Sequence, residues 1–201
     1  MNTQSPSEKA ESLITALEKY GQGDYIGESI SQLEHCLQAA NQANQSGARN
    51  ELVIAALLHD IGQIIPLEST KEVRMNLRDG TENVGRVGHE AIGAAYLRSL
   101  GFSETVCQLV NSHVAAKRYL TAINDAYYAS LSSASQRSLA FQGGPFQGSE
   151  LQMFEMDPLR DEMVALRLWD DGAKLVGVEE STPRAGFYRN MIVDHLERRT
   201  D

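Results

Sequence analysis

The chain has 201 residues, of which 42% are hydrophobic and 22% are charged. These values exclude a disordered tail or a fibre and are typical of a globular protein with one domain. The formal net charge of −9 argues against nucleic acid as a partner, because phosphates are bound by basic surfaces. The sequence has no apolar run long enough to span a bilayer and no export-signal pattern at its start. We therefore expect a cytoplasmic protein with a single domain, 1–201.

The first half of the chain predicts three helices. Ser7 is expected to cap the first, which Gly21 ends, and a second helical run covers 27–45. The nearly continuous apolar run 51–62 has the composition of either a buried strand or a buried helix. Its alanines, the preceding Asn50 cap and the Gly62 stop favour the helix.

The polar, glycine-punctuated stretch 66–88 predicts a loop or a short irregular helix, and a lid over a site is one use for it. No convincing pair of segments with the alternating pattern of paired strands appears between the helices. The sequence therefore predicts an all-α fold, with further helices over 89–100, 103–120, 122–142, 147–155 and 158–169 and a last helix after Pro183.

The dipeptide His59-Asp60 stands at the end of the apolar run. A lone helical histidine is more often a hydrogen-bonded structural residue than a metal ligand. A carboxylate at the end of a buried helix, however, is costly unless it is paired or bound to a metal. Imidazole with carboxylate suits iron, manganese or zinc, and the two oxygens of one carboxylate can bridge two cations. We expect Asp60 to have such a partner.

The order of the histidines and aspartates along the chain resembles the HD-domain superfamily, whose metal ligands follow the pattern H…HD…D. His89 and His113 are the additional histidines of its dinuclear version. A closer resemblance, from about residue 13 to about residue 196, is to the HD-domain mixed-valence di-iron oxygenases of organophosphonate degradation, the PhnZ-like group. Five runs carry it: DYIGESISQLEH (24–35), VIAALLHDIG (53–62), HVAAKRYL (113–120), FQGGP (141–145) and LRLWD (166–170).

The resemblance implies an HD-domain helical bundle that holds two iron ions as an Fe(II)/Fe(III) pair, with O2 as cosubstrate. It also implies a small hydroxyphosphonate as substrate, and no obligate protein partner is evident. Within this scheme Asp60 bridges the two irons, one held by His35, His59 and Asp170 and the other by His89 and His113.

Three further residues are candidates for binding the phosphonate. Lys117 lies four residues after His113, so on a helix its ammonium reaches an anion bound at that metal. Arg167 offers a planar fork for phosphonate oxygens, and the resemblance gives Ser135 the role of a hydroxyl donor. The alternative for Arg167 is an ordinary surface charge.

The other end of the substrate is assigned to Tyr25, Glu28 and Gln63. Tyr25 and Glu28 face one pocket if their turn is helical, and the resemblance places them at the substrate amine, with Tyr25 also able to occupy a metal position before substrate arrives. Gln63 departs from the HD-x-G-H pattern of the aminophosphonate-cleaving enzymes. A site that lacks that imidazole but keeps Glu28 and Tyr25 is suited to a quaternary ammonium, which has no N–H to donate. This favours the TmpB-like branch, which converts (R)-1-hydroxy-2-(trimethylammonio)ethylphosphonate to glycine betaine and phosphate.

Four alternatives stay open at this point. The enzyme could instead cleave 2-amino-1-hydroxyethylphosphonate to glycine and phosphate, or it could be an HD-type metal-dependent phosphohydrolase. A non-catalytic HD-like domain that binds a ligand or protein is a third possibility, although that class usually lacks ligands. The fourth is a helical bundle whose histidines are core residues without metal.

Overall fold

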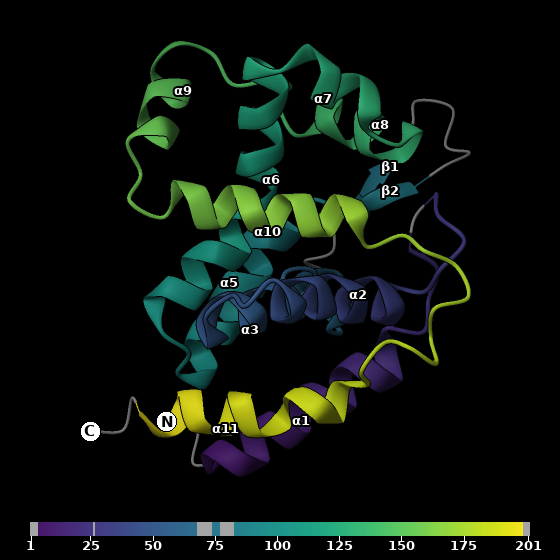
Figure 1. Cartoon of the computed structure of the whole chain (residues 1–201), viewed down its shortest axis with the longest axis vertical. Helices are drawn as coiled ribbons and strands as arrows, with labels where there is room; N and C mark the ends of the chain where they lie inside the picture. The colour runs from purple at the N-terminus through teal and green to yellow at the C-terminus, as the bar shows by residue number, and fades with distance from the viewer. Residues whose placement is uncertain (1–3, 26, 68–73, 77–82, 199–201) are drawn as a thin grey trace.

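Helices make up most of the computed structural model, which describes residues 4–25, 27–67, 74–76 and 83–198 (Figure 1). The all-α prediction is confirmed. The described helices are α1 (Pro6–Tyr20), α2 (Gln32–Gln45), α3 (Asn50–Leu58), α4 (Ile61–Ile64), α5 (His89–Leu100), α6 (Glu104–Ile123), α7 (Asp125–Ser130), α8 (Ser133–Phe141), α9 (Gly148–Glu155), α10 (Arg160–Gly172), the 3-10 helix η1 (Ala185–Tyr188) and α11 (Arg189–Glu197).

Helix α3 lies at the centre of the packing. It contacts α2, α6, α10 and α11, and every residue from Leu52 to Leu58 is buried. A helix that is apolar on all sides must be covered on all sides, and each buried Leu, Ile or Val contributes about 1.5–3 kcal/mol. Figure 1 shows α10 crossing the molecule between the α7–α9 end and α2, with α1 and α11 side by side at the opposite end. The residues at the end of α3 are therefore surrounded by helices.

Several helices begin at positions other than the expected ones. Helix α3 begins at Asn50 itself, with Arg49 as its N-cap and no capping bond from a side chain, so the expected Asn50 cap is wrong. Ser5, not Ser7, caps α1, because Ser5 Oγ accepts from the Glu8 backbone N–H and the Glu8 carboxylate accepts from the Ser5 N–H in a capping box. Helix α2 begins at Gln32 under a Ser31 cap, and not at Gly27. Gly27 has a φ of +79°, which a right-handed helix does not contain. The residues before α2 therefore form a turn.

The expected helix over 51–62 is interrupted. Helix α3 ends at Leu58, and α4 begins again at Ile61, with Asp60 as its N-cap at φ −99° and ψ 12°. Gly62 lies inside α4 and does not end a helix. A Cβ there would overlap the backbone carbonyl of His89, so only glycine lets α4 pack this closely on the start of α5. The helical region 122–142 is likewise two helices, α7 and α8.

One antiparallel strand pair lies within the stretch that was expected to lack strands. Strand β1 (Arg74–Asn76) pairs with β2 (Asn83–Arg86), with Arg74 opposite Arg86 and Asn76 opposite Asn83. Each strand is too short to leave a reliable alternating pattern in the sequence. The residues proposed as a lid include 68–73 and 77–82, which lie outside the described residues.

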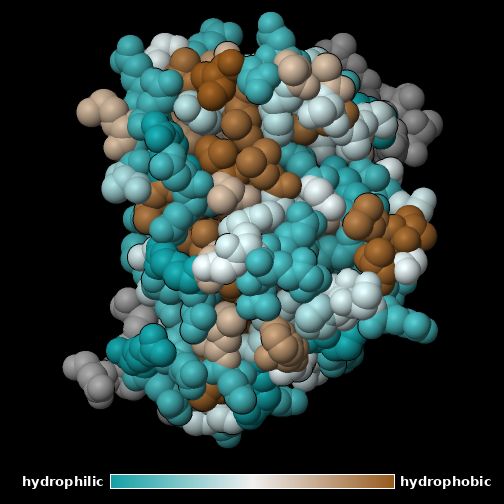
Figure 2. Space-filling model, in the orientation of Figure 1, coloured by the Kyte–Doolittle hydropathy of each residue, from teal (hydrophilic) through white to brown (hydrophobic). Residues whose placement is uncertain are grey.

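The surface carries both hydrophilic and hydrophobic residues. Figure 2 shows a face that is mostly hydrophilic, with separate hydrophobic patches between the polar side chains. None of the helices in the described part of the chain is both long and apolar enough to cross a bilayer.

Candidate metal centre

Four histidine side chains are anchored in the same way. In each, Nδ1 lies 2.8–3.0 Å from a backbone carbonyl oxygen; the pairs are His35 with Ala173, His59 with Ala56, His89 with Arg86 and His113 with Val110. A carbonyl oxygen only accepts, so Nδ1 carries the proton and donates it. The lone pair of each Nε2 is therefore turned away from its anchor, as in metal-bound histidines.

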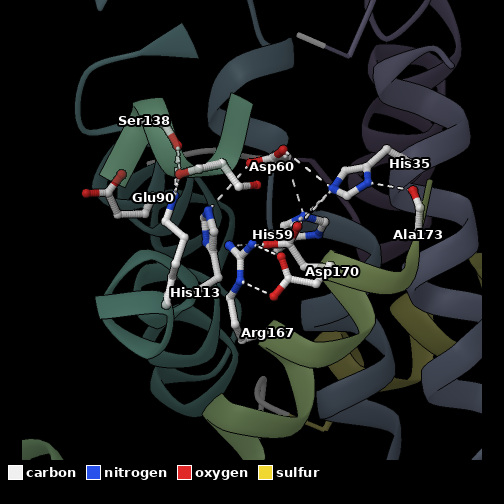
Figure 3. Close-up of polar contacts among 12 residues, drawn as sticks. His35, His59, Asp60, Glu90, His113, Ser138, Arg167, Asp170 and Ala173 are labelled. Atoms are coloured by element: carbon white, nitrogen blue, oxygen red, sulfur yellow. Dashed lines mark hydrogen bonds and ion pairs between the residues drawn. The ribbon is translucent and has the colours of Figure 1, made fainter. Parts of the chain in front are cut away.

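The first group of converging side chains is His35, His59 and Asp170 (Figure 3). The Nε2 atoms of the two histidines are 3.0 Å apart. Asp170 Oδ1 lies 3.3 Å from His35 Nε2, and Asp170 Oδ2 lies 3.9 Å from His59 Nε2. All three residues are buried. They come from α2, the end of α3 and α10, three elements that pack on one another.

The second group is His89, His113 and Asp60, which are also buried. The Nε2 atoms of His89 and His113 are 2.9 Å apart, and Asp60 Oδ1 lies 3.3 and 3.5 Å from them. His89 is the first residue of α5 and His113 lies on α6, the helix against which α5 packs. The short α4, held close to α5 by Gly62, brings Asp60 to this pair.

Asp60 faces both groups. Its Oδ1 points to His89 and His113, while its Oδ2 lies 3.9 Å from His35 Nε2 and 3.8 Å from His59 Nε2. One carboxylate thus offers one oxygen to each of two clusters of donor atoms, which is the arrangement that a carboxylate bridging two cations needs.

The protonation states suit metal binding. Burial lowers the pKa of His113 to about 3, with the neighbouring His89 adding to the effect, and burial also lowers the pKa of His59. Burial alone would raise the pKa of Asp60, but the imidazoles around it, first His59, hold that pKa below its usual value. Metal ligands must be deprotonated carboxylates and neutral imidazoles, and these shifts favour both forms.

The distances between the donor atoms also indicate that a cation binds between them. Two unprotonated Nε2 lone pairs that face each other at 2.9–3.0 Å repel one another unless a positive charge lies between them. Such a separation is expected of two neighbouring ligands that are each about 2.1 Å from one ion. Asp170 Oδ1 is buried and has no hydrogen-bond partner, which is costly for a charged oxygen. The residues present therefore fit metal ions.

Arg167 is buried at 3% exposure, so it is not the surface charge that one alternative predicted. Its Nη1 donates to Asp170 Oδ2 at 2.8 Å, its Nε donates to Asp171 Oδ2 at 3.0 Å, and its Nη2 also contacts Asp171. Burial opposes a charge on Asp170, but the Arg167 guanidinium together with His35 and His59 outweighs burial and holds the pKa of Asp170 well below its usual range. Most of the guanidinium N–H groups that were expected to bind phosphonate oxygens therefore donate to Asp170 and Asp171.

A cavity of about 70 Å³ opens beside the two groups. It is lined by four of the converging residues (Asp60, His89, His113 and Asp170) and by all six residues assigned to the substrate (Tyr25, Glu28, Gln63, Lys117, Ser135 and Arg167). Lys117 is buried, and its Nζ donates to Ser138 Oγ at 2.8 Å and to the Ser135 carbonyl at 3.5 Å. Burial, followed by the nearby Arg167, lowers the pKa of Lys117 to about 7. The cavity therefore contains a cation whose closest partners are neutral.

Tyr25 and Glu28 reach the cavity from a turn, not from the helix expected for them. The Glu28 N–H donates to the Tyr25 carbonyl at 2.9 Å, and the Tyr25 ring stacks on His35 with a centroid distance of 3.8 Å. Burial, with Asp170 as the next cause, raises the pKa of Tyr25 well above its usual value. Glu28 Oε1 lies 3.6 Å from Lys174 Nζ.

Gln63 connects two segments that carry candidate ligands. Its Oε1 accepts from the Arg86 backbone N–H at 2.9 Å. The Arg86 carbonyl in turn accepts from His89 Nδ1, and the Arg86 guanidinium donates to the Ile65 carbonyl at 3.1 Å. Gln63 thus supports the position of His89 as well as lining the cavity.

Sequence reasoning missed several residues around the cavity. The lining also contains Ser138, Gln32, Val114, Ala134 and Gln142, and Lys174 lies behind the lining, paired with Glu28. Ser138 follows Ser135 by three residues on α8, so helical spacing from an assigned residue was an available signal for it. Lys174 lies beyond the end of α10, where helical spacing gives no such signal.

Known proteins resemble this chain over most of its length. Residues 33–139 match the family model of the HD domain. The hydroxymethylphosphonate dioxygenase of Gimesia maris (strain ATCC 29201 / DSM 8797 / 534-30) is 40% identical over 195 residues, which cover 97% of this chain and 92% of that protein.

Two further relatives are similar in extent. The [1-hydroxy-2-(trimethylamino)ethyl]phosphonate dioxygenase (glycine-betaine-forming) of Leisingera caerulea is 38% identical over 175 residues, 87% of this chain and 84% of that protein. Uncharacterized protein L432 of Acanthamoeba polyphaga mimivirus is 34% identical over 200 residues, all of this chain and 87% of that protein. The chain therefore belongs to the HD-domain family and, within it, to the PhnZ-like oxygenases.

Proposed function

We propose that this oxygenase holds two iron ions in the candidate metal centre and uses O2 to cleave the C–P bond of a small 1-hydroxyphosphonate. The observation that carries the proposal is the position of Asp60, whose two oxygens face two separate groups of donors. One iron is assigned to His35, His59 and Asp170, and the other to His89 and His113, with Asp60 between them.

The donor set supports iron. With Asp60 counted in the second group, each group consists of two imidazoles and one carboxylate, a combination typical of non-haem iron in oxygenases. When bound, the iron pair would supply O2 activation and a Lewis acid for the substrate oxygens.

The chain's own residues supply the environment of the phosphonate. Lys117, hydrogen-bonded to Ser138 Oγ, stands on the same helix as His113 and offsets the charge of a phosphonate placed beside that metal position. Ser135 and Ser138, both on α8, add hydroxyl groups. Arg167 stabilises Asp170 in its ionised form and orients it.

The reaction balances without an added reductant. For hydroxymethylphosphonate, the C–P bond and one C–H bond break, one oxygen atom from O2 goes to carbon and one to phosphorus, and the four electrons removed from the substrate reduce O2. The products are formate and phosphate. The trimethylammonium compound would give glycine betaine and phosphate with the same balance.

Three substrates fit this reaction, and they differ only in the group on C1. They are hydroxymethylphosphonate, on which one relative acts by its name, the trimethylammonium compound expected from Gln63 and named for another relative, and 2-amino-1-hydroxyethylphosphonate. A free negative charge on Glu28 would favour the two ammonium compounds over hydroxymethylphosphonate, which has no cationic group.

The test is phosphate release by protein loaded with Fe(II) under anaerobic conditions, partly oxidised, and then given each hydroxyphosphonate with or without O2. We expect one phosphate for each O2 consumed and none without O2. Equal release of phosphate without O2, or from phosphate esters, would instead identify a phosphohydrolase.

A further inference from the structure

Glu28 and Lys174 form an ion pair at the edge of the cavity. Glu28 Oε1 lies 3.6 Å from Lys174 Nζ, and their side chains are 18% and 16% exposed. Glu28 lines the cavity, whereas Lys174 stands behind it, within 3.5 Å of the hydroxyl oxygens of Ser132 and Ser135. Glu28 Oε1 is buried without a hydrogen bond, so Lys174 is the cation that compensates this oxygen.

The backbone around Lys174 is fixed on both sides. The carbonyl of Ala173 accepts from His35 Nδ1 at 2.9 Å. Leu175 exchanges two hydrogen bonds with Gln38, its N–H donating to Oε1 at 2.9 Å and its carbonyl accepting from Nε2 at 2.8 Å. Lys174 therefore does not leave Glu28 by a simple movement of the chain.

The charges around the cavity show why this pair matters. Among the described residues of its lining, the carboxylates are Glu28, Asp60 and Asp170. Asp60 and Asp170 face the histidines, which leaves Glu28 as the group that would recognise a cationic substituent. Lys174 already neutralises Glu28, and a second cation placed there meets like-charge repulsion in a partly buried site.

We propose that Lys174 is a specificity-determining residue that, as the built-in counter-ion of Glu28, makes the site prefer a hydroxyphosphonate without a cationic substituent, of the hydroxymethylphosphonate type. This inference rests on the proposed function. This preference is the alternative to the trimethylammonium compound expected from Gln63.

The first experiment compares kcat/KM for hydroxymethylphosphonate and for the trimethylammonium compound in the wild type, Lys174→Met and Lys19→Met. Lys19 is an exposed lysine on α1 that does not line the cavity, and it serves as the matched control. We expect the wild type and Lys19→Met to prefer hydroxymethylphosphonate. In Lys174→Met the ratio should move about tenfold or more towards the trimethylammonium compound, because Glu28 becomes available.

The second experiment does not depend on turnover. Metal-free protein is heated with and without tetramethylammonium chloride, with sodium chloride at equal ionic strength as the reference. A rise in Tm specific to tetramethylammonium is expected in Lys174→Met, and its absence is expected in the wild type and in the double variant Glu28→Gln/Lys174→Met.

The outcomes separate the two proposals. If the wild type releases no phosphate from any hydroxyphosphonate, the proposed function fails and the substrate preference with it. If the wild type turns over both compounds equally or prefers the trimethylammonium compound, or if Lys174→Met changes neither the ratio nor the response to tetramethylammonium, the role of Lys174 is overturned while the oxygenase function stands.

Discussion

Arg167 donates from Nη1 to Oδ2 of Asp170 at 2.8 Å, one helical turn away on α10, and both side chains are buried. The other oxygen of Asp170 faces His35. The Arg167 guanidinium therefore binds one oxygen of Asp170 while the other oxygen faces the proposed metal position. This relationship gives Arg167 a structural role whatever it contributes to substrate binding.

Replacing Arg167 by methionine keeps much of the side-chain volume but removes the cation. Asp170 and Asp171 then lose the cation that they share, although Asp171 still accepts from the Tyr127 hydroxyl. We expect the free energy of unfolding of the metal-free protein to fall by about 3–5 kcal/mol, as for other broken buried pairs. Denaturant unfolding measures this change. Arg160→Met is the control, because Arg160 is exposed and paired with Asp161, and it should leave the transition nearly unchanged. Equal behaviour of the two variants would contradict the assigned role.

Replacing Asp60 by asparagine removes the charge of the proposed bridge with little change in shape. We expect the variant to lose binding of both metal ions and, with it, the rise in Tm that metal gives to the wild type. Metal analysis after anaerobic iron loading and thermal unfolding with and without iron measure the two effects. Asp125→Asn, at an exposed position on α7, should behave like the wild type. Retention of one or both ions in Asp60→Asn would show that Asp60 is not shared.

Replacing Gln63 by leucine removes the acceptor of the Arg86 N–H and loosens the segment whose carbonyl anchors His89. We expect iron at the His89 and His113 position to bind about 10–100-fold more weakly, as when groups that orient metal ligands are lost. Gln63→Glu keeps an acceptor oxygen and should restore most of the affinity. Calorimetric titration with Fe(II) under anaerobic conditions separates the two sites. A change in KM with unchanged metal affinity would make Gln63 a substrate contact alone.

Lys117 should make stability depend on pH. Its pKa is lowered to about 7 in the folded protein from about 10.4 in an unfolded chain. Between these values the unfolded state binds more protons, so the free energy of unfolding rises with pH, by at most about 1.4 kcal/mol per unit from this group. In metal-free and phosphate-free buffer, the wild type should gain stability relative to Lys117→Met from pH 7 to 9. Parallel curves for the two proteins would contradict the prediction.

The sequence predicts the parts of the site that depend on regular spacing or on the family pattern. The residues of the two donor groups lie on or directly beside helices that the apolar pattern of the sequence predicts, as for α3 and His59. The all-α fold follows from the same patterns. The buried position of Asp60 also follows, because it ends the most apolar run of the chain.

The remainder depends on contacts between distant segments. The turn that carries Tyr25 and Glu28 exists because Gly27 adopts a positive φ against α8, and no local pattern distinguishes this turn from a first helical turn. The contact of Gln63 with Arg86 spans 23 residues. Lys174 meets Glu28 from the other half of the chain, so neither its partial burial nor its partner is visible in its neighbours.

The central claim is that one carboxylate joins two irons, and electron paramagnetic resonance of iron-loaded, half-oxidised protein tests it most directly. Two irons bridged by Asp60 predict a signal from an exchange-coupled Fe(II)/Fe(III) pair that Asp60→Asn abolishes. An isolated ferric signal in the wild type, or a coupled signal that persists in Asp60→Asn, would contradict the account.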